Sequence, residues 1–106
     1  MEIKITKKEK LQEINNSMVH NFYYLVHGRI INDEKTKYKK FKLVLFFDVF
    51  DVQEYFEKES YTKDDIKIYV DALIDGYINI IPNYNNTSGF FQVCTDTIER
   101  YNKICA

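Results

Sequence analysis

The chain is poor in the residue types that enzyme motifs use. Its three Gly are too few for the Gly-rich loops that cradle phosphates in nucleotide-binding proteins. Its two Cys and two His form neither Cys-x-x-Cys nor His-x-x-x-His, the spacings of common zinc sites. The longest apolar run, Leu43 to Phe47, is far below the ~18 residues of a membrane helix. We therefore expect a protein that binds neither a metal nor a cofactor and does not cross a membrane.

The N-terminus also lacks the apolar stretch of a secretory signal peptide, because its first residues lead into a polar segment. We therefore expect a cytoplasmic protein in a bacterial host, where Cys94 and Cys105 would be reduced thiols. On one helix these two residues would lie ~16 Å apart, which is too far for a disulfide.

Composition points to the source of the chain. Phe, Tyr, Ile, Asn and Lys make up about half of the residues, whereas Gly, Ala, Arg and Pro together supply only eight. The first group has AT-rich codons and the second has GC-rich codons, which indicates the genome of a low-GC bacterium or its phage. Nine Tyr and eight Phe are many for this length, and such rings fill protein cores as well as binding surfaces.

For each residue with catalytic potential, a structural role is more common than a catalytic one. Cys94 falls on the apolar face of a predicted helix, where free Cys is usually a small core residue. His27 has no partner motif and is expected to be a partly buried, hydrogen-bonded imidazole. Asp48 and Asp51 could hold a divalent ion with a third acid, but Asp at the end of a strand usually caps the next helix. We therefore predict a protein that is not an enzyme.

The order of the patterns predicts a single α+β domain over residues 1–106, with a small antiparallel sheet covered by helices. Residues about 21–31 and 38–50 are rich in β-branched and aromatic side chains, which is typical of strands. The polar segment 32–37 has the length of a hairpin connection between them.

Three helices are predicted after the hairpin, at about 51–59, 62–80 and 88–105. The middle helix has the strongest signals, since Thr62 and Asp65 have the spacing of a capping box. Its apolar residues follow at intervals of three and four, the period of one helix face. This stripe comprises Ile66, Tyr69, Val70, Leu73, Tyr77 and Ile80.

Two segments stay ambiguous. Residues 1–18 would divide into a short strand at 2–6 and a short helix at 7–16, because two apolar residues of the second part are three apart. Residues 90–94 fit a strand as well as the first turns of the last helix.

Charge is divided between the two halves of the chain. Residues 1–42 carry ten Lys/Arg and five Asp/Glu, whereas residues 43–106 carry five Lys/Arg and eleven Asp/Glu. The net charge of −1 therefore conceals a basic half and an acidic half, and each half offers a candidate binding surface.

The basic surface is predicted on the hairpin, where cations and an exposed ring could follow a phosphate backbone and stack a base. Its candidate residues are Lys35, Lys37, Tyr38, Lys39, Lys40 and Lys42. Strand alternation places Lys40 and Lys42 on the face opposite to Phe41, which we expect in the core. The competing interpretation is an edge strand whose lysines prevent aggregation between sheets.

The acidic surface is predicted on the helix at 62–80, where carboxylates lie away from the apolar stripe. Its candidate residues are Asp64, Asp71 and Asp75, with Tyr61 and Tyr69 as aromatic anchors. Carboxylates on a rigid helix can occupy a cationic groove that normally holds nucleic-acid phosphates. The competing interpretation is an ordinary solvated helix face.

In size, AT-rich composition, dense Tyr and Asn and an acidic helical half, the chain resembles the small phage and mobile-element proteins that inhibit host defence, including anti-CRISPR proteins. The resemblance implies a protein partner, such as a cationic nucleic-acid-binding host protein, and a block of its nucleic-acid site or of a conformational step. We therefore expect a non-enzymatic protein-binding inhibitor or regulator. A nucleic-acid-binding module that uses the basic hairpin is the alternative, and a homodimer is compatible with the sequence.

Overall fold

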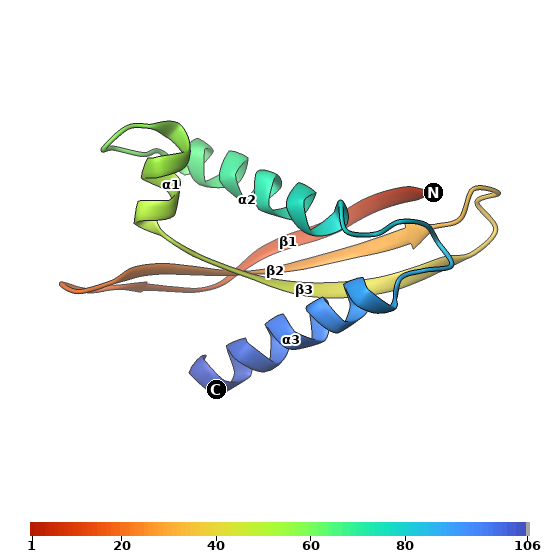
Figure 1. Ribbon diagram of the computed structural model, residues 1–106. Helices are drawn as coiled ribbons and strands as arrows, with labels where there is room; N and C mark the ends of the chain where they lie inside the picture. Colours follow the sequence, from red (N-terminus) through yellow and green to blue (C-terminus); the bar gives the residue numbers. More distant parts are fainter. Residues whose placement is uncertain (106) are drawn as a thin grey trace.

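The computed structural model describes residues 1–105, which form three strands followed by three helices (Figure 1). The strands are β1 (Glu2–Asn15), β2 (His20–Ile31) and β3 (Tyr38–Asp48), and they form one antiparallel sheet in the order β1-β2-β3. The helices are α1 (Val49–Phe56), α2 (Lys63–Ile78) and α3 (Ser88–Cys105). The predicted α+β class is confirmed. None of these three helices has the combined length and apolarity that crossing a membrane requires.

Strand β1 is the main departure from the prediction. In place of a short strand and a short helix, a single strand of 14 residues pairs with β2. The register shifts twice, between Ile5 and Lys7 and between Lys10 and Gln12. An extra residue in a strand moves the following side chains to the opposite face. The apolar residues of β1 therefore do not alternate regularly, which hides the strand from a reading of the sequence.

The boundary between β3 and α1 is set by a capping box. The Asp48 side chain accepts the N–H of Asp51, and the Asp51 side chain accepts the N–H of Asp48, each at 2.9 Å. Strand β3 therefore ends at Asp48, earlier than predicted, and α1 begins at Val49. Thr62 and Asp65 form the predicted box at the start of α2. Helix α3 has its predicted bounds, so residues 90–94 are helical.

The hydrophobic core lies between one face of the sheet and the helices. Its buried strand residues are Phe22, Val26, Ile30, Phe41, Leu43, Leu45 and Phe47. Helix α2 contributes Ile66, Val70 and Ile74. The predicted stripe included Ile80, but this residue is 49% exposed because α2 ends at Ile78. Ile74 takes the inward position instead.

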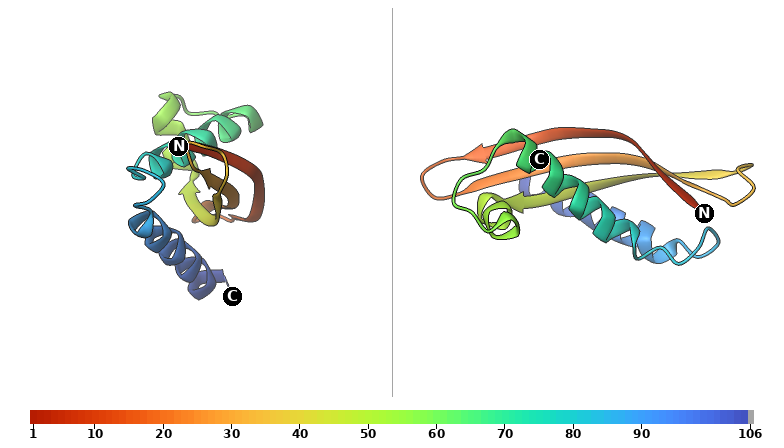
Figure 2. Two further views of the ribbon diagram at one scale, coloured as in Figure 1. Left: turned by 90° about the vertical axis from the view of Figure 1, so that its right-hand side faces the viewer. Right: turned by 90° about the horizontal axis from the view of Figure 1, so that it is seen from above.

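Helix α3 follows the outer edge of β3 and passes along its length from the core face of the sheet to the opposite face (Figures 1 and 2). Near its start, the Phe90 ring meets Phe41 on the core face, with ring centroids 4.9 Å apart. In its middle, the Thr97 hydroxyl accepts a backbone N–H of β3 at 3.0 Å. Near its end, Tyr101 packs against Tyr23, which points to the opposite face. The helix thus seals this edge, whereas no described residue pairs with the outer edge of β1.

Gly28 allows a close crossing between β2 and β3. It lies opposite Phe41, and an added Cβ would be 2.3 Å from the Phe41 Cζ. The missing side chain therefore leaves room for the Phe41 ring to lie across β2 and reach Phe90. Gly28 pairs with Ile5 of β1, and the extra residue of the bulge beside this pair belongs to β1.

Candidate functional site

The three predicted carboxylates lie on the outer face of α2. Asp64, Asp71 and Asp75 are exposed, and Ile68, 51% exposed, lies among them at helical spacing. The Asp71 Oδ1 accepts a hydrogen bond from the Lys8 Nζ of β1 at 2.7 Å. Asp71 is therefore partly neutralised within the chain, so most of the uncompensated negative charge of this face belongs to Asp64 and Asp75.

Tyr69, a predicted anchor, joins this face to α1. Its half-buried ring packs edge-on against Phe47 in the core, at 5.0 Å, and against Tyr55 of α1, at 5.3 Å. Burial raises the pKa of Tyr69, and the negative charges of Asp51 and Asp48 raise it further. The ring is therefore a structural link in an acidic environment, with only part of its surface available to a partner.

Large apolar side chains are exposed on α1 as well. Phe50 is 71% exposed and Tyr55 is 53% exposed. Exposed apolar groups among charges are frequent at protein interfaces. We call the combined region of α1 and α2 the acidic helical surface. It consists of Phe50, Asp51, Glu54, Tyr55, Asp64, Ile68, Tyr69, Asp71 and Asp75.

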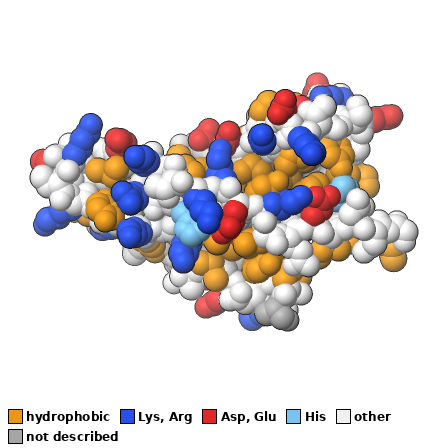
Figure 3. Space-filling view, turned by 180° about the vertical axis from the view of Figure 1, so that it is seen from behind, with side chains coloured by type: hydrophobic (Ala, Val, Ile, Leu, Met, Phe, Trp, Pro, Cys, Tyr) orange, Lys and Arg blue, Asp and Glu red, His pale blue; other side chains and the backbone are white. Residues whose placement is uncertain are grey.

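A hollow of about 480 Å³ opens between β1 and α2, and the second predicted anchor, Tyr61, lies on its rim. Its apolar lining comes from Phe22, Tyr24 and Ile66. The polar residues around it are Lys10, Glu13, Tyr61, Thr62, Lys63 and Lys67. Figure 3 shows apolar side chains exposed on this side of the molecule, between charged ones. The Tyr61 hydroxyl lies 3.3 Å from the His20 Nδ1, which holds the ring in place.

The paired carboxylates have structural roles. Asp48 and Asp51 are occupied by the backbone N–H groups of the α1 capping box. Asp65 caps α2 and receives the Lys58 Nζ at 2.7 Å, and this ammonium group together with the Thr62 N–H lowers the pKa of Asp65. Among residues 1–105, no three His, Cys, Asp or Glu come together as a metal site would require.

The residues of the enzymatic alternative are not brought together. Cys94 is part of the core, and burial raises the pKa of its thiol to about 11. A thiol with such a pKa is a poor nucleophile, because the thiolate is the reactive form. His27 projects from the other face of the sheet, opposite Lys42. The sheet therefore separates the imidazole from the thiol.

The six candidates of the basic hairpin are split between different places. Lys39 points to the core face, where its Nζ donates to the Tyr84 carbonyl at 2.7 Å and to the Thr87 hydroxyl at 3.2 Å. It also lies 4.4 Å from the Tyr84 ring centre, so its role is to fix the loop before α3. Lys40 and Lys42 are exposed on the opposite face, as the alternation predicted.

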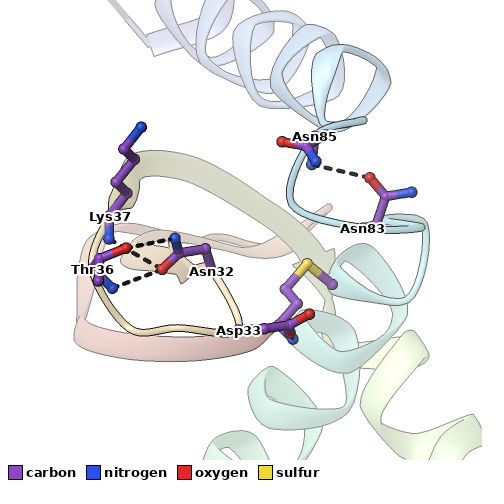
Figure 4. A network of polar contacts seen from close by, with 7 residues as sticks. Asn32, Asp33, Thr36, Lys37, Asn83 and Asn85 are labelled. Atoms are coloured by element: carbon purple, nitrogen blue, oxygen red, sulfur yellow. Dashed lines mark hydrogen bonds and ion pairs between the residues drawn. The ribbon is translucent and has the colours of Figure 1, made fainter.

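Lys35 and Lys37 lie in the connection between β2 and β3, which Asn32 organises (Figure 4). The Asn32 Oδ1 accepts the N–H groups of Thr36 and Lys37 at 2.9 and 3.1 Å. The Asn32 Nδ2 donates to the Thr36 hydroxyl at 3.0 Å. Nearby, the N-terminal ammonium group pairs with Asp33. The turn is therefore an ordered structure that projects two lysines beyond the end of the sheet.

The open face of the sheet gathers more cations than the hairpin alone supplies. Antiparallel pairing aligns Lys4, Arg29 and Lys40 in one row across the three strands. The next row on the same face contains Lys7, His27 and Lys42. We call these the cationic rows. Figure 3 shows Lys and Arg gathered over the half of the molecule that holds the β2–β3 connection.

Sequence reasoning missed Lys4, Lys7 and Arg29 as members of this surface. The alternation of Ile3 and Ile5 with Lys4 was the signal available, since it places Lys4 on the face away from the core. This alternation ends at the first bulge, so it does not predict that the strand continues to Lys7. Arg29 could be placed only with the pairing of β2, which fixes its neighbours on both sides.

No protein-family model, no curated protein and no solved structure matches this chain.

Proposed function

We propose that this protein is a non-enzymatic inhibitor or regulator of phage or mobile-element origin that binds a protein partner through α1 and α2. The partner is a cationic nucleic-acid-binding protein of a bacterial host, such as a nuclease, as the resemblance to anti-CRISPR proteins implies. The observation that carries the proposal is the outer face of α2, where the exposed Ile68 lies between the exposed carboxylates of Asp64 and Asp75, with a hollow of about 480 Å³ on the β1 side of the same helix. This combination provides an anchor site next to a source of charge complementarity.

The apolar part of the surface would supply the affinity. Phe22, Tyr24 and Ile66 line a hollow that can take an apolar side chain of a partner. Ile68 and Phe50 are more than half exposed on the neighbouring helices. Aromatic and aliphatic side chains buried in such pockets dominate the energetics of protein interfaces.

The charged part of the surface would supply orientation and speed of association. Asp64 and Asp75 lie on one face of α2, separated by about 16 Å along the helix axis. Two carboxylates on one rigid face can pair with cations of a groove that normally holds nucleic-acid phosphates. Lys63 and Lys67 on the flank of α2 temper this negative charge. The partner is therefore expected to contact the outer face of α2 and not its β1 side alone.

The test is a pull-down from a bacterial lysate with charge-reversed variants. Wild type should retain a cationic protein whose binding weakens as salt increases, because charge pairing is screened. Asp64→Lys/Asp75→Lys should lose this protein. Asp96→Lys/Glu99→Lys on α3 makes the same change in net charge at a distant exposed site and should retain it.

Ile68→Ser probes the apolar contact without touching the core, since Ile68 is 51% exposed. It should weaken capture of the same partner at least tenfold. Recovery of no cationic protein would overturn the proposal. Equal losses for the α2 and α3 charge variants would also overturn it, because the effect would then follow net charge and not a surface.

A further inference from the structure

We propose that the open face of the sheet is a second binding site, which takes the phosphate backbone of single-stranded nucleic acid on its cationic rows. This site goes beyond the proposed protein-binding function and lies on the other side of the sheet from α2. It includes two residues of the predicted hairpin surface, Lys40 and Lys42, and adds Lys4, Arg29, Lys7 and His27.

The first argument is the arrangement of like charges. Arg29 lies directly between Lys4 and Lys40, with neighbouring strands about 4.8 Å apart. Like charges directly opposite each other destabilise a sheet. The sequence therefore maintains an unfavourable row in the protein without a ligand, and an anion placed over the row would relieve the repulsion. On this face, Glu2 and Glu9 of β1 lie beyond the two rows, so the positive charge is concentrated in the rows between them.

The second argument is a hollow of about 410 Å³ within the rows. Its side walls are the side chains of His27, Arg29, Lys40 and Lys42, with Thr6 at the bulge of β1. Gly28 and Phe41 also line it, and because they alternate with these residues they present their backbone to this face. The hollow is thus bordered by donors and cations, which suits a phosphate group.

The third argument concerns polar groups that lack partners. The His27 Nε2 is buried and has no hydrogen-bond partner in the described part of the chain, with the nearest Glu9 oxygen at 3.8 Å. Glu9 also lies 3.5 Å from the Lys7 Nζ, so Lys7 is partly neutralised. No ion pair within the described chain involves Lys4, Arg29, Lys40 or Lys42. Four cations therefore remain for phosphate contacts.

The fourth argument distinguishes a single strand from a duplex. Rows repeat every two residues, about 7 Å along the strands, so a linear polyanion would meet them in succession. Tyr38, on the same face and 52% exposed, offers a ring for base stacking and carries the Arg29 guanidinium 4.9 Å from its centre. The major groove of a duplex admits a helix or a two-stranded ribbon, which a three-stranded face exceeds.

The test measures fluorescence anisotropy of labelled 20-nucleotide single strands of DNA and RNA between 50 and 200 mM salt. With four phosphate contacts, the affinity of wild type should fall about 50-fold over this range, as roughly 0.7 counterions are released per contact. Lys4→Gln/Lys40→Gln should halve the slope of log affinity against log salt. Tyr38→Ala should weaken binding roughly fivefold or more, since it removes the stacking ring.

Lys63→Gln/Lys67→Gln on α2 is the matched control, with the same loss of charge on the other side of the sheet. It should leave the affinity and the salt slope unchanged. Lys35→Gln/Lys37→Gln in the β2–β3 connection should have a smaller effect than Lys4→Gln/Lys40→Gln. Circular dichroism should show that all variants are folded, because each substitution is at an exposed position.

Four results would overturn the proposal: no binding of either oligonucleotide by wild type at 50 mM salt, an equal loss for the control, tighter binding of duplex than of single strand, or equal binding of poly-glutamate or anionic vesicles. The last result would show a general attraction to anions. Asp64→Lys/Asp75→Lys should retain oligonucleotide binding, so failure of the protein-binding proposal and failure of this one are separate outcomes.

Discussion

Replacing Lys40 by Glu should stabilise the protein and at the same time weaken its binding of single-stranded nucleic acid. Lys40 is exposed at the end of the row that runs through Arg29 to Lys4. The substitution converts one like-charge pair across neighbouring strands into an opposite-charge pair. Stability and binding should therefore change in opposite directions, which few surface substitutions do.

The magnitude follows from the position of the pair. Relief of a like-charge pair and gain of an opposite-charge pair are each worth roughly 0.2–1 kcal/mol across strands, so the sum is about 1 kcal/mol. For a domain of this size, about 1 kcal/mol corresponds to a rise of about 4–8 °C in Tm. The strands lie about 4.8 Å apart, within the Debye length of about 10 Å at 0.1 M salt. In 1 M salt, most of the gain should disappear.

Thermal unfolding followed by circular dichroism at 0.05, 0.15 and 1 M salt measures this effect. Lys37→Glu is the matched control, because it changes the net charge equally but lies in the β2–β3 connection, outside the rows. It should leave the Tm unchanged or slightly lower. A Lys40→Glu variant that is no more stable than wild type at low salt would refute the reasoning, as would a gain that 1 M salt does not reduce.

Three further predictions concern the core and the helix termini. Gly28→Ala should destabilise the protein by about 1–3 kcal/mol in urea unfolding, because its Cβ would overlap the Phe41 ring; an unchanged midpoint would contradict the 2.3 Å approach. In the folded protein, a thiol reagent at pH 8 should modify Cys105 well before Cys94, whose pKa is raised to about 11, and equal rates would show that the core opens. The lowered pKa of Asp65 stabilises the fold above the ordinary carboxyl pKa of ~3.9, and this contribution is lost as pH falls through the lowered value. Asp65→Asn should therefore be less stable than wild type at pH 7, with a difference that closes below pH 4 in pH-dependent unfolding.

The parts of the fold that the sequence predicts are those with strong local signals. The capping box of Thr62 and Asp65 specifies where α2 begins, because it satisfies two backbone N–H groups by side chains a few residues away. The box at Asp48 and Asp51 sets the start of α1 in the same way, but the apolar residues Val49 and Phe50 extend the strand pattern past it, so the predicted start was two residues too late. A strand was predicted only for residues 2–6 of β1, and its continuation to Asn15 could not be predicted, because the bulges are defined by the pairing with β2 and break the alternation. The end of α2 was placed too late, since the exposed Ile80 continues the helical spacing beyond Ile78.

The candidate surfaces depend on long-range pairing to different degrees. Alternation within β3 separates Lys40 from Lys39, so these two could be assigned to opposite faces from the sequence. The alignment of Lys4 with Arg29 is a property of two strands and has no local signal. The ion pair between Asp71 and Lys8 of β1 also has no local signal, and it neutralises part of the negative charge that the sequence predicts on α2.

The position of α3 on the edge of β3 has a consequence for biosynthesis. The strand is translated before the helix that seals it, so a nascent chain exposes the backbone groups of β3 until α3 has emerged and docked. Unpaired strand edges are sites of aggregation between chains. A chain released from the ribosome before α3 is translated would therefore have a sheet whose outer strands, β1 and β3, both have an uncovered edge. The lysines of β1 protect one of these edges by charge, whereas β3 depends on completion of the chain.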